Sequence, residues 1–192
     1  MTKARLHPSL LELRGAMRDM VFRQRNGKHF VSVKSMGSTK EPSPAQVAHR
    51  ERFRRAVEYG KFVMSNDAIR PVYEQAAAEK NVSVFPLCIG DYLKAPSIDS
   101  IDARDYTGKV GDPLQIVASD DFGVIRVDVV LTDDDKGTLI ESGPAVQNGS
   151  GHWTYTATQP ANAGITVQFQ VTVMDRPGGT TVQRGTKRIQ AN

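Results

Sequence analysis

Two short strand-forming runs joined by an Asn-Gly dipeptide place the strongest constraint on how this chain folds. They lie in the stretch MVFRQRNGKHFVSVK, residues 20–34. Asparagine and glycine both accept the positive φ angles that a type I′ turn needs, and this turn matches the twist of paired strands. Because a two-residue loop fixes the register, the sequence predicts a β-hairpin in which Arg25 faces Lys28 and Met20 faces Val33.

The two faces of this hairpin differ in chemistry. Residues that alternate along each strand share a face, so apolar side chains collect on one side and cations on the other. The apolar face consists of Met20, Phe22, Val31 and Val33, and the cationic face of Val21, Arg23, Arg25, Lys28 and Phe30. An isolated two-stranded hairpin is only marginally stable in water, so we expect a helix or another chain to cover the apolar face.

Length and charge indicate two small domains of opposite charge. The chain has 192 residues, of which 39% are hydrophobic and 24% charged, as is typical of soluble globular proteins. Residues 1–61 hold 14 Lys and Arg against 5 Asp and Glu, whereas the remainder holds 11 against 16. This asymmetry favours a polyanionic partner for the first part or head-to-tail contact between copies, with solvated surface as the competing interpretation.

About three helices are predicted after the hairpin. Ser43 is expected to cap the first, with Pro44 at its first helical position, where the missing N–H costs nothing. A second helix is expected from Pro71 until Asn81, and a third from the cap Ser83 until the chain reaches Ala95-Pro96. Before the hairpin, only a short helical turn at residues 9–13 is suggested.

The first helix is expected to have an apolar side and two ion pairs. Pairs four residues apart join Glu51 to Arg55 and Arg54 to Glu58. The predicted apolar side consists of Ala45, Ala48, Phe53, Ala56, Val57, Phe62 and Val63.

Alternating patterns and turn residues replace the helical pattern from residue 98 onward. The predicted strands lie at residues 98–101, 114–119, 124–132, 138–146, 152–158, 165–174 and 180–190. In the longest of them, the odd-numbered residues from Ile165 to Val173 are expected to face inward, and Trp153 and Tyr155 to anchor the core. About seven short strands over this length predict an all-β sandwich of immunoglobulin type. The predicted fold is therefore an α+β domain over residues 1–97 followed by this sandwich over residues 98–192.

Both halves resemble known bacterial sequences. The segments SDDFGVIRVDVVLTDDDKGTLIESGPA, HWTYTAT and VQFQVTVMDRPGG resemble bacterial immunoglobulin-like domains, which serve mostly as spacers and binding modules on surface proteins and on phage or tail-like structural proteins. The segments VFRQRNGKHFVSVK, PSPAQVAHRERFRRAVEYGK and IGDYLKAPSI look like a domain of unknown function from bacteroidete proteins. That pattern has a glycine where this chain has Arg18, and the resemblance implies no chemistry to carry over.

No pattern in the sequence predicts catalysis, a cofactor or a metal centre. The four histidines fall in four different predicted elements without paired spacing, and no serine sits in a nucleophile elbow. Cys88 is the single cysteine and is expected to be buried, so no intrachain disulfide is predicted. Acidic turns would bind calcium only if several converged, and capping of their own turns by aspartate is the favoured interpretation because no EF-hand-like spacing is present.

Partner binding is instead expected at charged residues. The predicted interaction residues for assembly or for a polyanion are Arg23, Arg25, Lys28, Phe30, Arg50, Arg54 and Arg55, and the predicted acidic docking turns contain Asp120, Asp121, Asp133, Asp134 and Asp135. A two-stranded ribbon fits the major groove of DNA, so nucleic-acid binding is one hypothesis. The other hypothesis is assembly, by docking of cations on the acidic turns of the next copy or by pairing of strand edges.

We expect a non-enzymatic structural protein that self-associates, or joins other structural subunits, in a particle, tube or filament of phage type. The apolar run after Lys3 and Arg5 is interrupted by Glu12 and Arg14, so neither a signal peptide nor a membrane span is predicted. The expected location is the cytoplasm, or a virion or tail-like particle assembled there. Nucleic-acid binding through the basic hairpin and helix is the alternative function.

Overall fold

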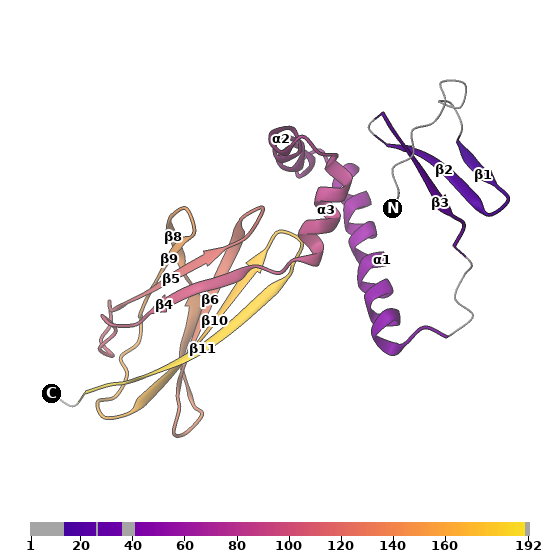
Figure 1. Ribbon diagram of the computed structural model, residues 1–192. Helices are drawn as coiled ribbons and strands as arrows, with labels where there is room; N and C mark the ends of the chain where they lie inside the picture. Colours follow the sequence, from indigo (N-terminus) through magenta and orange to yellow (C-terminus); the bar gives the residue numbers. More distant parts are fainter. Residues whose placement is uncertain (1–13, 26, 36–40, 191–192) are drawn as a thin grey trace. The chain divides into compact units, whose positions relative to one another are not determined.

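The computed structural model describes residues 14–25, 27–35 and 41–190 (Figure 1). The chain divides into two compact units, Met1–Gln46 and Val47–Asn192, and each is described by itself. Three helices and three antiparallel sheets make up the described residues, so the fold is mixed α+β, as predicted. The suggested helical turn at residues 9–13 lies outside the described residues.

The first unit contains a three-stranded sheet, here called the N-terminal sheet. Its strands are β1 (Gly15–Met17), β2 (Met20–Arg25) and β3 (Lys28–Val33), in the order β1-β2-β3. The predicted hairpin register is confirmed from the Met20–Val33 pair to the Arg25–Lys28 pair, and Gly27 has a φ of +71°. Strand β1 was not predicted, because three residues that begin with glycine carry no alternating pattern.

Three helices follow: α1 (Pro44–Met64), α2 (Arg70–Lys80) and α3 (Val84–Leu93). The predicted cap of α1 is confirmed as a capping box, since Ser43 Oγ accepts the Gln46 N–H at 3.3 Å and Gln46 Oε1 accepts the Ser43 N–H at 3.0 Å. Asn81 ends α2 in the left-handed conformation. Ser83 is the N-cap residue of α3, as predicted, but its side chain makes no capping hydrogen bond there.

The buried side of α1 agrees with the predicted one only in part. Ala56, Gly60 and Val63 are buried, whereas Phe53 and Phe62 are 46% and 51% exposed. A Cβ atom on Gly60 would lie 2.9 Å from Cε2 of Phe85 on α3. Small residues therefore define the contact side, because they let α3 approach α1 closely and leave the two phenylalanines outside the contact.

Eight strands form two four-stranded antiparallel sheets, here called the sandwich. Their bounds are β4 (Ser97–Asp102), β5 (Pro113–Ser119), β6 (Val124–Asp133), β7 (Leu139–Pro144), β8 (Val146–Gly149), β9 (His152–Thr156), β10 (Thr166–Asp175) and β11 (Thr180–Arg188). One sheet has the order β11-β10-β6-β7 and the other β4-β5-β9-β8. The two sheets share a single hydrophobic core.

The core of the sandwich contains the predicted residues. Trp153 and Tyr155 are 6% and 4% exposed, and the odd-numbered residues of β10 from Val167 to Val173 are buried. The predicted single strand at 138–146 is instead two strands, β7 and β8, that lie in different sheets. Ala145 is buried between them, where the chain crosses from one sheet to the other, and a crossing of this kind interrupts no sequence pattern.

The helices share their unit with the sandwich. Val63, Tyr73 and Cys88 form a second buried cluster, which confirms the predicted burial of the cysteine. Phe122, from the turn between β5 and β6, packs against this cluster, with its ring centroid 4.7 Å from that of Tyr73. The change from helix to strand falls between α3 and β4, and a domain boundary at residues 97–98 stays a prediction.

Candidate interaction surfaces

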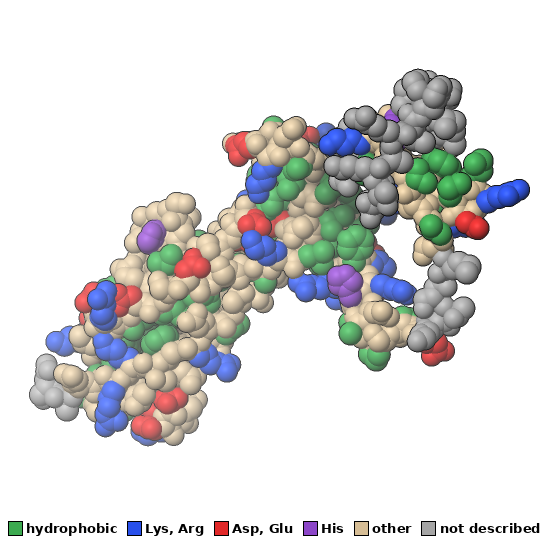
Figure 2. All heavy atoms as spheres, in the orientation of Figure 1, with side chains coloured by type: hydrophobic (Ala, Val, Ile, Leu, Met, Phe, Trp, Pro, Cys, Tyr) green, Lys and Arg blue, Asp and Glu red, His purple; other side chains and the backbone are tan. Residues whose placement is uncertain are grey.

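The N-terminal sheet presents a row of exposed apolar side chains. Cross-strand pairing places Met17 beside Met20, and Met20 beside Val33, so these residues form one row across all three strands. They are 53%, 42% and 77% exposed, respectively, and we call them the apolar row. Figure 2 shows hydrophobic side chains gathered on the surface of this sheet. The next row pairs Gly15 with the half-buried Phe22, so the apolar surface continues along the strand.

The opposite face of the same sheet carries the predicted cations. Arg23 pairs with Phe30 across the strands, and both Arg23 and Lys28 are exposed while Phe30 is half-buried. Arg25 lies opposite Lys28, but its side chain is outside the described part of the structure. The structure thus brings together Arg23, Lys28 and Phe30 as predicted from the register.

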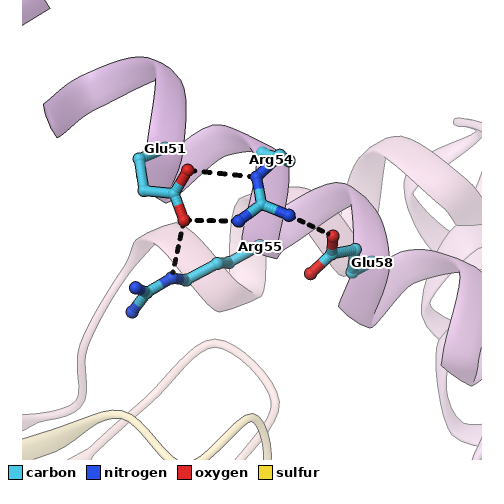
Figure 3. A network of polar contacts seen from close by, with 4 residues as sticks. All are labelled: Glu51, Arg54, Arg55 and Glu58. Atoms are coloured by element: carbon cyan, nitrogen blue, oxygen red, sulfur yellow. Dashed lines mark hydrogen bonds and ion pairs between the residues drawn. The ribbon is translucent and has the colours of Figure 1, made fainter. Parts of the chain in front are cut away.

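The predicted cations of α1 belong to the other unit, and two of them are engaged in ion pairs (Figure 3). Arg54 contacts Glu51 Oε1 at 2.6 Å through Nη2 and Glu58 Oε1 at 2.7 Å through Nη1. Arg55 Nε lies 3.3 Å from the same oxygen of Glu51. The hydrogen bond from Arg54 holds the pKa of Glu51 below its usual value. Both i,i+4 pairs are therefore confirmed, while Arg50 is exposed on the same helix.

The predicted acidic docking turns lie at opposite ends of β6. Asp120 and Asp121 precede this ten-residue strand and Asp133 ends it, which separates the two groups by about 30 Å at 3.3 Å per residue. Asp133 is buried, and its Oδ1 accepts the N–H of Asp135 at 3.1 Å. Asp120 Oδ2 likewise accepts the Phe122 N–H at 2.9 Å. The favoured interpretation of these aspartates as caps of their own turns is confirmed.

The remaining acidic side chains of these turns differ in whether another side chain contacts them. Asp121 forms an ion pair with Lys94 at 2.7 Å, and Asp134 Oδ1 accepts a hydrogen bond from Gln168 Nε2 at 3.0 Å. Asp135 is exposed. Of the two predicted docking turns, the one after β6 therefore presents the acidic side chains that are available for a partner. Figure 2 shows acidic and basic side chains interspersed over the visible face of the sandwich.

A buried polar chain that was not predicted joins the three helices. The hydroxyls of Tyr59 on α1 and Tyr73 on α2 lie 2.8 Å apart, and Tyr73 donates to Oδ2 of Asp91 on α3. Asp91 is 2% exposed. Burial raises its pKa to about 6, opposed by the Tyr73 hydrogen bond and reinforced by the charges of Asp120 and Asp175. The sequence signal for it is the single acid within the otherwise apolar helix VFPLCIGDYL.

Within residues 14–25, 27–35 and 41–190, no group of three His, Cys, Asp or Glu side chains is placed to hold a metal ion. None of the three helices described combines the length and apolar composition needed to cross a bilayer.

Comparisons with known proteins identify no family. No family model matches the chain, and no curated protein matches it. A crystal structure of an engineered protein aligns with 50% of this chain at 19% identity and a TM-score of 0.36, and the alignment spans 20% of that protein's length.

Proposed function

We propose that the chain is a non-enzymatic structural protein that self-associates through its N-terminal sheet. The observation that carries this proposal is the apolar row, since Met17, Met20 and Val33 lie side by side and expose 42–77% of their surface. A contiguous exposed apolar patch on a polar surface marks an interaction site. A second copy of the chain is the simplest occupant, because it brings an identical apolar row.

The open edge of β3 supports the same partner. Among the described strands, β3 pairs only with β2, so no described strand occupies the backbone donors and acceptors of its other edge. Antiparallel pairing of β3 with β3 of another copy about a twofold axis normal to the sheet keeps the apolar rows on one face. This edge contact contributes backbone hydrogen bonds and places Val33, the most exposed member of the row, beside the neighbouring strand, whereas Met17 and Met20 are covered only when a further sheet stacks on the joined apolar face.

A twofold contact alone gives a dimer, and a filament, tube or phage-type particle needs a second contact between different surfaces. The exposed acidic turn that contains Asp134 and Asp135 is a suitable surface, since a cationic face of a neighbouring copy complements it. Arg23 and Lys28 supply such a face on the N-terminal sheet.

We further propose that the sandwich is an immunoglobulin-like spacer. In the order of the chain, the strands correspond to A, B, C, C′, D, E, F and G of such domains. The sheets β4-β5-β9-β8 and β11-β10-β6-β7 then read A-B-E-D and G-F-C-C′. This correspondence supports the resemblance noted in the sequence, and it fits a role in separating or displaying other parts of an assembly.

The alternative, nucleic-acid binding, loses part of its support. Arg54 and Arg55 are paired with Glu51 and Glu58, so their charge is partly neutralised on the helix itself. The face with Arg23 and Lys28 remains available for phosphate contacts. Absorbance at 260 and 280 nm during purification distinguishes this alternative from assembly, because bound nucleic acid raises the ratio.

The test is Val33→Glu, measured by size-exclusion chromatography with light scattering. Val33 is 77% exposed, so the substitution leaves the free sheet intact but buries a charge in the proposed contact. We expect the wild type to be oligomeric and the variant's dissociation constant to rise at least about tenfold.

Val110→Glu is the matched control, since Val110 is 61% exposed in a loop of the other unit and should leave association unchanged. A wild type that stays monomeric at high concentration, or equal association of the Val33 variant and the wild type, would overturn the proposal.

A further inference from the structure

Three aspartates in the unit Val47–Asn192, two of them buried and one half-buried, each have an oxygen without a hydrogen-bond donor. The atoms are Asp91 Oδ1, Asp120 Oδ1 and Asp175 Oδ2. Asp91 and Asp175 are 2% and 1% exposed, and Asp120 is half-buried. We call these residues the aspartate cluster. A buried carboxylate oxygen without a donor is costly when the group is ionised, even though the other oxygen of each carboxylate accepts a hydrogen bond.

The cluster joins the helices to the sandwich. Asp91 lies on α3, Asp120 in the turn between β5 and β6, and Asp175 at the end of β10. Strand β10 runs antiparallel to β6 and pairs Asp175 with Val124, so the sandwich aspartates lie at the same end of these strands. The charges of Asp120, Asp175 and Asp121 all raise the pKa of Asp91, which shows that they act on it together.

None of the nearby described cations makes a hydrogen bond to Asp91. Lys94 pairs with Asp121 at 2.7 Å, and the Lys80 ammonium lies 5.2 Å from the centroid of the Phe122 ring. Arg176 lowers the pKa of Tyr59, and its Nε atom makes no hydrogen bond. Cys88 is a buried thiol whose pKa is raised by burial. Among the described residues, no basic side chain is hydrogen-bonded to Asp91, so its remaining source of neutralisation is a proton.

We propose that the aspartate cluster is a proton-operated latch that holds α2 and α3 against the sandwich when Asp91 is neutral and loosens them when Asp91 is ionised. The mechanical link is Tyr73, which donates to Asp91 and whose ring packs on Phe122 of the β5–β6 turn. Repulsion between Asp91 and Asp120 therefore acts directly on this helix-to-strand contact. The proposal is independent of self-association, because it concerns only the second unit.

The direction of the pH effect follows from the raised pKa of Asp91, about 6 against an ordinary value of 3.8. A carboxyl whose pKa is higher in the folded state binds its proton more tightly there than in the opened state. Its stabilising contribution is complete below about pH 4 and is lost as the pH rises through about 6. Opening of the contact should therefore increase between pH 5 and pH 8.

Cys88 provides the readout, because it is the single cysteine and is fully buried beside Tyr73. The rate at which 4,4′-dithiodipyridine modifies Cys88 measures opening of the helix cluster. Comparison of the wild type with Asp91→Asn at each pH cancels the intrinsic pH dependence of the thiol. The asparagine keeps an oxygen for Tyr73 and imitates the neutral acid.

We expect the wild-type rate to exceed the Asp91→Asn rate by about tenfold or more at pH 8, and this excess to be about tenfold smaller at pH 5. Asp135→Asn, at the other end of β6, should match the wild type at both values. A wild-type-to-variant ratio that does not change between pH 5 and pH 8 would overturn the proposal.

A second measurement needs no variant. In a carbon-13 NMR titration of the wild-type carboxyl groups, Asp91 should show a pKa of about 6, well above the ordinary aspartate value of 3.8. A pKa of Asp91 at or below 3.8 would also refute the latch, even if the asparagine variant failed to fold.

Discussion

Arg18 has a backbone conformation that favours glycine. Its φ is +50°, and it lies in the tight turn between β1 and β2, where Met17 pairs with Met20. A side chain in this left-handed region crowds its own backbone and costs roughly 1–2 kcal/mol. A glycine at this position would adopt the same φ without this crowding.

Replacement of Arg18 by glycine should stabilise the N-terminal sheet by about 0.5–1 kcal/mol, because the removed strain exceeds the extra chain entropy of glycine in the unfolded state. Amide hydrogen exchange of β2 and β3 measures this local stability, and protection should rise. Arg23→Gly is the control, since a glycine within an ordinary strand position should lower protection. Faster exchange in the Arg18 variant would contradict the strain argument.

Single-residue roles were predictable from sequence only where they are local. Aspartate capping of a turn depends on atoms two or three residues away, so Asp120 and Asp133 could be interpreted from their own turns. The pairing of Arg54 and Arg55 with glutamates depends on helical spacing and was equally accessible. Asp91 could not be found in this way, because its burial depends on the β5–β6 turn, which lies about thirty residues further along the chain.

At the scale of the elements, the packing of strand β11 against strand β10 depends on a glycine, which has no side chain. Gly185 pairs directly with Phe169, and a Cβ atom on this glycine would lie 2.4 Å from two atoms of the phenylalanine ring. Phe169 is 7% exposed and belongs to the core of the sandwich. The ring therefore occupies the space that any other residue at position 185 would need.

Gly185→Ala should destabilise the sandwich by about 1–3 kcal/mol, because the methyl group displaces a packed ring. Urea unfolding followed by the fluorescence of Trp153, the single tryptophan, reports on this core. Gly90→Ala is the matched control: nothing lies within 4 Å of its Cβ position in α3, so helix propensity should stabilise it by up to about 1 kcal/mol. An unchanged midpoint for the Gly185 variant would show that the ring moves freely.

Strands and their buried faces were predicted correctly where the sequence pattern is strong. The predictions failed where contacts between elements determine which residues are buried. The Asn-Gly turn determined the hairpin register, and alternation in β10 identified its buried face. The contact side of α1 was predicted correctly at Ala56 and Val63 but wrongly at Phe53 and Phe62, which are exposed. The crossing at Ala145 left no signal, since both sheets accept the same alternating pattern.

At the scale of the whole molecule, the charge asymmetry and the apolar row predict different responses to salt. Basic residues dominate residues 1–61 and acidic residues the remainder. Contacts between these charges weaken as the Debye length falls from about 10 Å at 0.1 M to about 3 Å at 1 M salt. Burial of apolar surface does not weaken in this way.

We therefore expect dimers formed through the N-terminal sheet to persist at about 1 M sodium chloride, whereas larger species that also use charged contacts dissociate. Light scattering at low and high salt measures both. Loss of every oligomer at high salt would indicate that charge, not the apolar row, holds the copies together. Release of nucleic acid under the same conditions would favour the alternative function.

The direction of the chain through the sandwich has a consequence for how this unit bears tension. Strand β4 begins next to the helices and β11 leaves at the opposite end, and the two run in the same direction and contact each other (Figure 1). A pull between the helices and Arg188 therefore acts along the strands. Such a pull slides neighbouring strands past each other and loads many backbone hydrogen bonds at once, whereas a pull across the strands would break them one at a time. The sandwich is thus built to resist stretching along its length.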